Sequence, residues 1–136
     1  MVVWKYPALL RERITDAGGR YRFQSMNIIS ICVVGIVFWS AVSMLSGAAE
    51  PWDAASFWTL IYPAALALSV VLGAIFQRVS LLAGAIVMFA QLPVVTALVG
   101  VSPLLAAGVI YVAVLSVPAM MLSWIAGRLR RFYSGE

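Results

Sequence analysis

The side chains that could do chemistry in the apolar part of this chain are few, and they fall at one depth. Five hydrogen-bonding residues are expected in the outer half of the apolar segments, namely Ser40, Ser43, Tyr62, Gln91 and Tyr111. Pro63 and Pro93 fall in the same layer. Each proline removes a backbone N–H and leaves a carbonyl one turn earlier without its usual donor.

This polar layer allows two hypotheses. In the first, the prolines bend the helices and the polar side chains bond between helices, each such bond contributing about 0.6 kcal/mol. In the second, the bends open a small cavity toward the outer leaflet that binds a lipid headgroup, a quinone or another amphipathic molecule. We prefer the first hypothesis and keep the second open.

The residue types that are missing exclude most catalytic chemistry. The chain has no histidine and one cysteine, Cys32, and its apolar runs contain no Asp, Glu, Lys or Arg. Imidazole ligation of haem, histidine metal sites and histidine-activated nucleophiles are therefore excluded, and so is proton coupling through an ionisable group in a span. We expect a protein that is not an enzyme, with no catalytic residue, no metal and no cofactor.

The elements that must position these residues are membrane spans. Of the 136 residues, 64% are hydrophobic and 10% charged, and the mean hydropathy is +1.03. Four apolar runs, at 26–48, 55–76, 79–99 and 104–126, each reach the roughly 20 residues that a helix needs to cross a bilayer. The short links between them predict an all-α membrane protein, an antiparallel bundle of four transmembrane helices.

The basic residues predict how the chain is threaded. All nine lie before the first run, between the second and third, or after the fourth. The positive-inside rule then places both termini in the cytoplasm, in a bacterial-type cytoplasmic (inner) membrane. The same distribution explains the net charge of +4 as a topology signal, so we expect no nucleic-acid partner.

The two ends of the chain are expected to contact lipid headgroups. Within the N-terminal segment 1–25, the stretch 4–19 is predicted to form a short amphipathic helix on the membrane surface that ends at Gly18-Gly19. Residues 127–136 are predicted to form a basic cytoplasmic tail. The arginines assigned to headgroup binding are Arg11, Arg13, Arg128, Arg130 and Arg131.

Small residues recur at every fourth position on two of the predicted spans. The second span carries Ala65, Ser69 and Gly73, and the fourth carries Ala119, Ser123 and Gly127. Such stripes allow helix backbones to approach closely, within the bundle or against another chain. Pro118 is a third predicted hinge, on the fourth span.

The function expected from these features is non-catalytic. The main hypothesis is an accessory, assembly or scaffold subunit of a larger membrane complex, whose partners are membrane lipids and either another integral membrane subunit or copies of itself. The alternative is a small homo-oligomeric transporter or channel for an uncharged, amphipathic or lipid-like substrate, with Gln91, Tyr62 and Tyr111 lining its path.

Overall fold

The computed structural model describes residues 6–48 and 50–135, and every regular element in that part of the chain is helical. Four of its helical segments are long and apolar enough to cross a membrane, which confirms the prediction of an all-α protein with four such helices. The elements in chain order are α1 (Tyr6–Ser46), η1 (Pro51–Asp53), η2 (Phe57–Ile61), α2 (Tyr62–Ile75), η3 (Gln77–Val79), α3 (Ser80–Phe89), α4 (Gln91–Val99) and α5 (Leu104–Tyr133).

The N-terminal part of the chain differs from the prediction. We expected a separate surface helix that ends at Gly18-Gly19, but α1 continues through both glycines as one helix of 41 residues. An interior glycine costs a helix only about 1 kcal/mol. Neither glycine has the positive φ of a helix stop, whereas Gly47, which follows the end of α1, has φ 66°. The first two residues of the expected helix, Trp4 and Lys5, lie outside the described residues.

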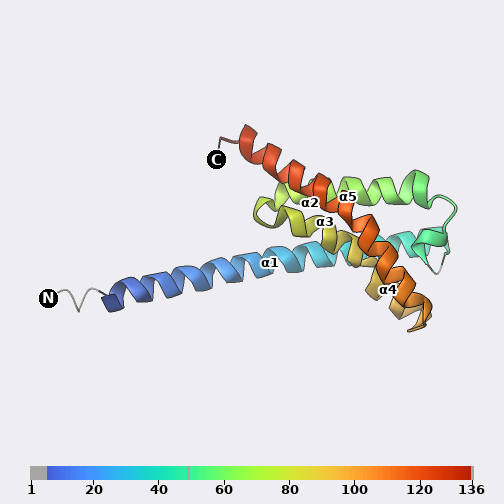
Figure 1. Cartoon of the computed structure of the whole chain (residues 1–136), viewed down its shortest axis with the longest axis horizontal. Coiled ribbons are helices and arrows are strands. Elements are labelled where there is room, and N and C mark those ends of the chain that lie inside the picture. The colour runs from blue at the N-terminus through green and yellow to red at the C-terminus, as the bar shows by residue number, and fades with distance from the viewer. Residues whose placement is uncertain (1–5, 49, 136) are drawn as a thin grey trace.

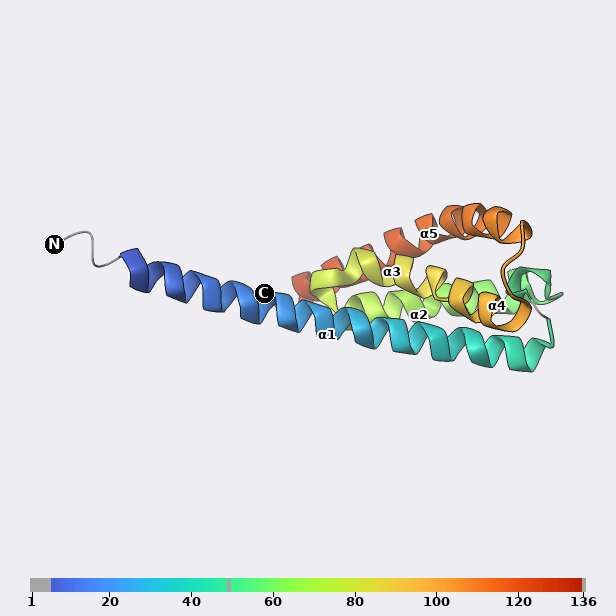
Figure 2. The ribbon, with the colours of Figure 1, turned by 90° about the horizontal axis from the view of Figure 1, so that it is seen from below.

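Helix α1 is much longer than the bundle against which it packs. Its first half, which we call the arm (residues 7–25), extends beyond the other helices, and its second half runs alongside them (Figures 1 and 2). The start of α1, the end of α5 and the turn between α2 and α3 lie toward one end of the molecule, while the α1–α2 and α4–α5 connections lie toward the other.

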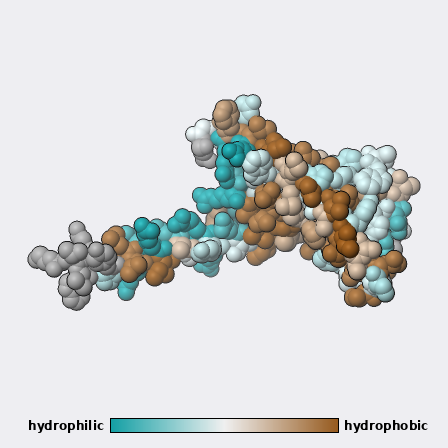
Figure 3. All heavy atoms as spheres, in the orientation of Figure 1, coloured by the Kyte–Doolittle hydropathy of each residue, from teal (hydrophilic) through white to brown (hydrophobic). Residues whose placement is uncertain are grey.

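Helix α3 occupies the centre of the bundle. It contacts α1 on one side and both α2 and α5 on the other, whereas α1 contacts mainly α3 and α4. On the face seen in Figure 3, hydrophobic residues cover the middle of the bundle, and the most hydrophilic residues lie along part of the arm and near the end of α5. This distribution matches an apolar bundle in lipid with one polar extension.

The predicted prolines affect their helices differently. Pro63 follows a π-helical turn, η2, in which Leu60 and Ile61 both donate to the carbonyl of Ser56. Pro93 follows the turn at Ala90 that separates α3 from α4. Pro118 lies inside α5, which remains helical through it and on to Tyr133, so most of the expected tail at 127–136 is helical as well.

Candidate functional site

The polar layer is built around the interruption between α3 and α4. Gln91 lies there with none of its surface exposed, and its Nε2 donates to the carbonyl of Met88 at 3.0 Å. Gln91 therefore bonds its own chain three residues back and not a neighbouring helix as we expected. Its Oε1 is buried without a hydrogen-bond partner among the described residues.

A second side chain, which the sequence analysis did not single out, completes this region. Trp39 of α1 is fully buried, and its Nε1 donates to the carbonyl of Val87 at 2.6 Å. The carbonyls of Val87 and Met88 in the last turn of α3 therefore both accept bonds from side chains. An interrupted helix requires this kind of compensation in lipid, where no water reaches the backbone.

The serines of the layer lie on a different surface from Gln91. Ser40 and Ser43 line a groove of about 470 Å³ between α1 and α4, and Pro93 and Val94 form part of its opposite wall. Ser43 is 8% exposed, and its Oγ has no partner among the described residues. Gln91 is not part of the groove wall. The groove is otherwise lined by Ile36, Met44, Ala97 and Leu98.

The two tyrosines belong to an aromatic cluster at the end of the bundle where α1 joins α2. Tyr62 stacks on Phe57, with ring centroids 5.9 Å apart, and Tyr111 meets Trp52 and Trp58 edge-on at 6.1 and 6.3 Å. The hydroxyl of Tyr62 donates to the carbonyl of Leu115 in α5 at 3.2 Å. The cluster therefore joins α2 to α5.

The predicted layer is thus divided into three parts: the α3–α4 break with Gln91, the α1–α4 groove with Ser40 and Ser43, and the aromatic cluster with Tyr62 and Tyr111. Only the groove offers both open volume and a hydroxyl without a partner. It is the part of the layer that is suited to binding a molecule.

The small-residue stripes lie in the interior of the bundle. Ala65 and Ser69 are fully buried, and a Cβ added to Gly73 would lie 2.7 Å from the Cα of Ser123 in α5. A Cβ on Gly127 would lie 2.6 Å from the Cβ of Ser80 in α3. The stripes on α2 and α5 therefore pack against neighbouring helices of the same chain.

Gly84 of α3 is a further close-packing position that the stripes did not include. An added Cβ there would overlap the carbonyl group of Ala119 and lie 2.6 Å from the backbone nitrogen of Met120. Ser80 and Gly84 form a small-xxx-small pair in the sequence, and this spacing was a usable signal.

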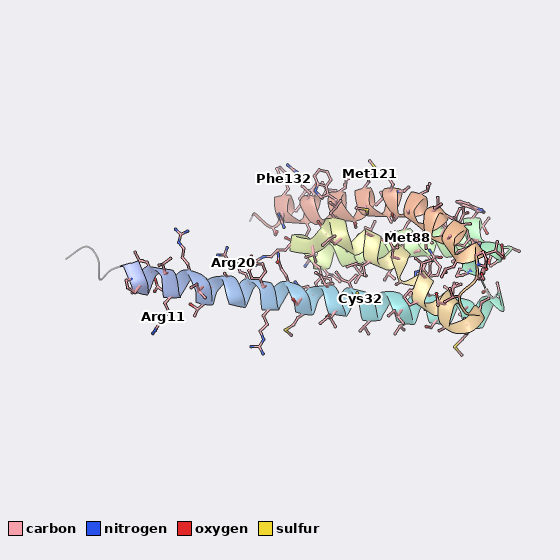
Figure 4. The ribbon with its side chains drawn as sticks, turned by 60° about the horizontal axis from the view of Figure 1, so that its bottom comes forward. Arg11, Arg20, Cys32, Met88, Met121 and Phe132 are labelled. Carbon is pink, nitrogen blue, oxygen red and sulfur yellow. The ribbon has the colours of Figure 1, made fainter. Side chains whose placement is uncertain are left out.

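The arginines assigned to headgroups separate into two groups. Arg11 and Arg13 are exposed on the arm, and Figure 4 shows Arg11 extending away from every other helix. At the C-terminal end, Arg130 Nη1 donates to the carbonyl of Ala74 at 3.2 Å, and Arg131 Nη2 to that of Gln77 at 2.8 Å. These two bonds tie the end of α5 to the end of α2 and to the start of η3. The guanidinium of Arg128 lies 5.0 Å from the ring centroid of Trp124 on α5.

Metal-binding groups do not assemble in the described part of the chain. No three residues of the types His, Cys, Asp and Glu come together there, and Cys32 is a partly buried free thiol on α1.

Comparison with known proteins finds no match for this chain. No known protein family matches the chain, and no similar curated protein or solved structure is found.

Proposed function

We propose that this chain is a non-catalytic scaffold or accessory subunit of a membrane complex, and that it binds a helical partner through the arm of α1. The proposed setting is a bacterial-type cytoplasmic membrane with the helices antiparallel and both termini inside. The positions of the basic residues support this orientation.

The observation that carries the proposal is an unpartnered apolar stripe on the arm. Leu10, Ile14, Ala17 and Tyr21 follow the alternating four- and three-residue spacing of a coiled-coil seam. Leu10 is 60% exposed, and Ile14 and Tyr21 are each 70% exposed. The same spacing continues along α1 to Ile28 and Ile31, which pack against the bundle.

The length of α1 argues that this stripe leaves the bilayer. A helix of 41 residues is roughly 60 Å long, about twice the thickness of the hydrocarbon layer. Because the arm continues the span without a break, it projects from the membrane and does not lie along its surface. Most helical stability in proteins comes from packing of an apolar face, which the arm lacks among the described residues, and Gly18 and Gly19 weaken the arm further. A second helix on the stripe would stabilise it.

Mutation of the stripe tests the proposal. The change is Leu10→Glu with Ile14→Glu, and the control is Ala8→Glu with Thr15→Glu, which adds the same charge on the other side of the arm. After gentle extraction from its own membranes, native mass spectrometry should show the wild type and the control with a stoichiometric partner subunit. The stripe variant should have lost it. A chain that is found only as a homo-oligomer in all three samples contradicts the proposal.

The groove between α1 and α4 favours a second candidate, a homo-oligomeric transporter of a lipid-like substrate. Its volume lies within the range of small-molecule sites, roughly 300–1,000 Å³, and the Oγ of Ser43 in its wall is buried without a hydrogen-bond partner among the described residues. In this candidate, Ser43→Ala reduces transport into proteoliposomes, whereas Gln91→Leu does not, because Gln91 lies outside the groove. Equal transport by the wild type and Ser43→Ala argues against this candidate.

A further inference from the structure

A second cavity lies at the opposite end of the bundle, where α5 passes the start of α3. It has a volume of about 400 Å³ and is lined by Ser80, Trp124, Arg128, Arg131 and Phe132. Four of these residues share one face of α5. Arg128 follows Trp124 by four residues, and Arg131 and Phe132 follow Arg128 by three and four.

The charge of this cavity has no counterpart among the described residues. Arg128 and Arg131 form no ion pair among these residues. The described acidic residues lie elsewhere: Glu12 and Asp16 are on the arm, and Glu50 and Asp53 are next to or within η1, in the connection between α1 and α2. Arg131 uses one nitrogen for the carbonyl of Gln77, which holds its guanidinium in place and leaves its other donors available.

The hydroxyl of a largely buried serine completes the polar wall. Ser80 is 6% exposed and lines the cavity, and we find no hydrogen bond from its hydroxyl among the described residues. Ser80 is also the first residue of α3, and the first turn of an α-helix carries N–H groups without intrahelical partners. Two guanidinium groups, a hydroxyl and this positive end of a helix dipole together suit a phosphate.

The surface beside the cavity is apolar. A neighbouring groove of about 310 Å³ shares Trp124, Arg128 and Phe132 with the cavity and adds Ile125 and Leu129. Phe132 lies on the outer side of α5 near its end (Figure 4). A phosphate in the cavity would therefore have an apolar channel next to it that runs along a membrane-spanning helix, which is the arrangement that a phospholipid needs.

We infer that the cavity of Ser80, Arg128 and Arg131 binds the phosphate of an anionic phospholipid, with an acyl chain along Trp124, Ile125 and Leu129. Basic pockets between membrane helices on the cytoplasmic side bind anionic headgroups in this way. The site differs from general attraction of basic residues to the membrane surface, because it has defined walls and includes the hydroxyl of a largely buried serine.

The test compares two single arginines at the same end of the bundle. Arg128→Gln removes a charge from the cavity, and Arg128 makes no backbone hydrogen bond that its loss would disrupt. Arg78→Gln is the matched control, because Arg78 is exposed in η3 and does not line the cavity. Native mass spectrometry of the detergent-solubilised full chain measures the binding of phosphatidylglycerol and of phosphatidylcholine with the same acyl chains.

We expect one phosphatidylglycerol to bind the wild type more tightly than phosphatidylcholine. Arg128→Gln should weaken that binding roughly tenfold or more, the usual effect of losing a charge-assisted hydrogen bond. Arg78→Gln should change it less than about twofold, because an exposed charge outside the site contributes little. Arg128→Lys, which keeps the charge, should lose less than Arg128→Gln, and equal circular dichroism spectra check that all variants are folded.

Three results would overturn the inference. Equal binding of the two lipids would show that the phosphate charge is not recognised. Equal weakening by Arg128→Gln and Arg78→Gln would show diffuse surface attraction. Full displacement of the lipid by millimolar inorganic phosphate would assign the cavity to a free anion, since the acyl groove would then contribute no affinity.

Discussion

Replacement of Gly84 by alanine should destabilise the bundle far more than the size of one methyl group suggests. The new Cβ would overlap the carbonyl of Ala119 and lie 2.6 Å from the nitrogen of Met120, and both groups are backbone atoms of α5. Backbone cannot rotate away as a side chain can, so α5 must move from α3. Overpacking of this kind costs typically 1–3 kcal/mol.

The helix propensity of alanine offsets part of this cost. Alanine is favoured over glycine by about 1 kcal/mol in a helix interior. Because the clash is with the backbone of α5 and not with a side chain, we take the upper end of the overpacking range, and the net loss is then about 2 kcal/mol. This corresponds to a roughly thirtyfold change in the unfolding equilibrium.

The measurement is unfolding in mixed micelles by titration with sodium dodecyl sulfate, followed by circular dichroism. Two controls grade the effect. Gly108→Ala places its Cβ 3.0 Å from the ring edge of Trp52, a side chain that can shift, so its loss should be smaller. Gly18→Ala meets nothing within 4 Å on the arm and should raise the helix signal without shifting the midpoint. If Gly84→Ala unfolds at the same midpoint as the wild type, the close packing of α3 on α5 is wrong.

Two further substitutions test the α3–α4 break by the same titration. Trp39→Phe removes the donor to the carbonyl of Val87 and leaves a small void, so we expect the unfolding free energy to fall by about 1–2 kcal/mol. The control is Trp58→Phe, at a residue that is 58% exposed, which should lower it by less than about 0.5 kcal/mol. Equal losses in the two variants would contradict the role of Trp39. Gln91→Leu loses the bond to Met88 but also removes the unpaired Oε1, so its unfolding free energy should change by less than about 1 kcal/mol. A loss above about 3 kcal/mol would mean that Gln91 holds two helices together.

The membrane-spanning helices were predictable because hydropathy is a property of each segment alone. The arm was not, because Gly18-Gly19 reads locally as a stop. A glycine pair ends a helix only if one residue turns to positive φ, and here the helical residues on both sides keep the pair in register.

The contacts of the polar and small residues depended on information that spacing does not contain. The stripe of Ala119, Ser123 and Gly127 predicted a close helix contact, but not that it would lie against Gly84, Gly73 and Ser80 of two different helices.

The position of Gln91 in its span can be predicted from the sequence, but its side-chain rotamer cannot. We therefore expected a bond to another helix, whereas the side chain turns back to Met88. Trp39 was not among the hydrogen-bonding residues that the sequence analysis named. Its place on the buried face of α1, four residues after Gly35 and eight after Ile31, was the available signal.

The most direct test of the proposed function is site-specific photocrosslinking in the native membrane. A benzoylphenylalanine replaces Ile14 on the arm stripe, and the control position is Met121, which is 59% exposed on the outer face of α5. The proposal predicts that position 14 crosslinks to one partner protein and that position 121 crosslinks to lipid alone. Two results would contradict an arm that binds a partner. One is a protein adduct at position 121 with none at position 14, and the other is an adduct at position 14 with another copy of this chain alone.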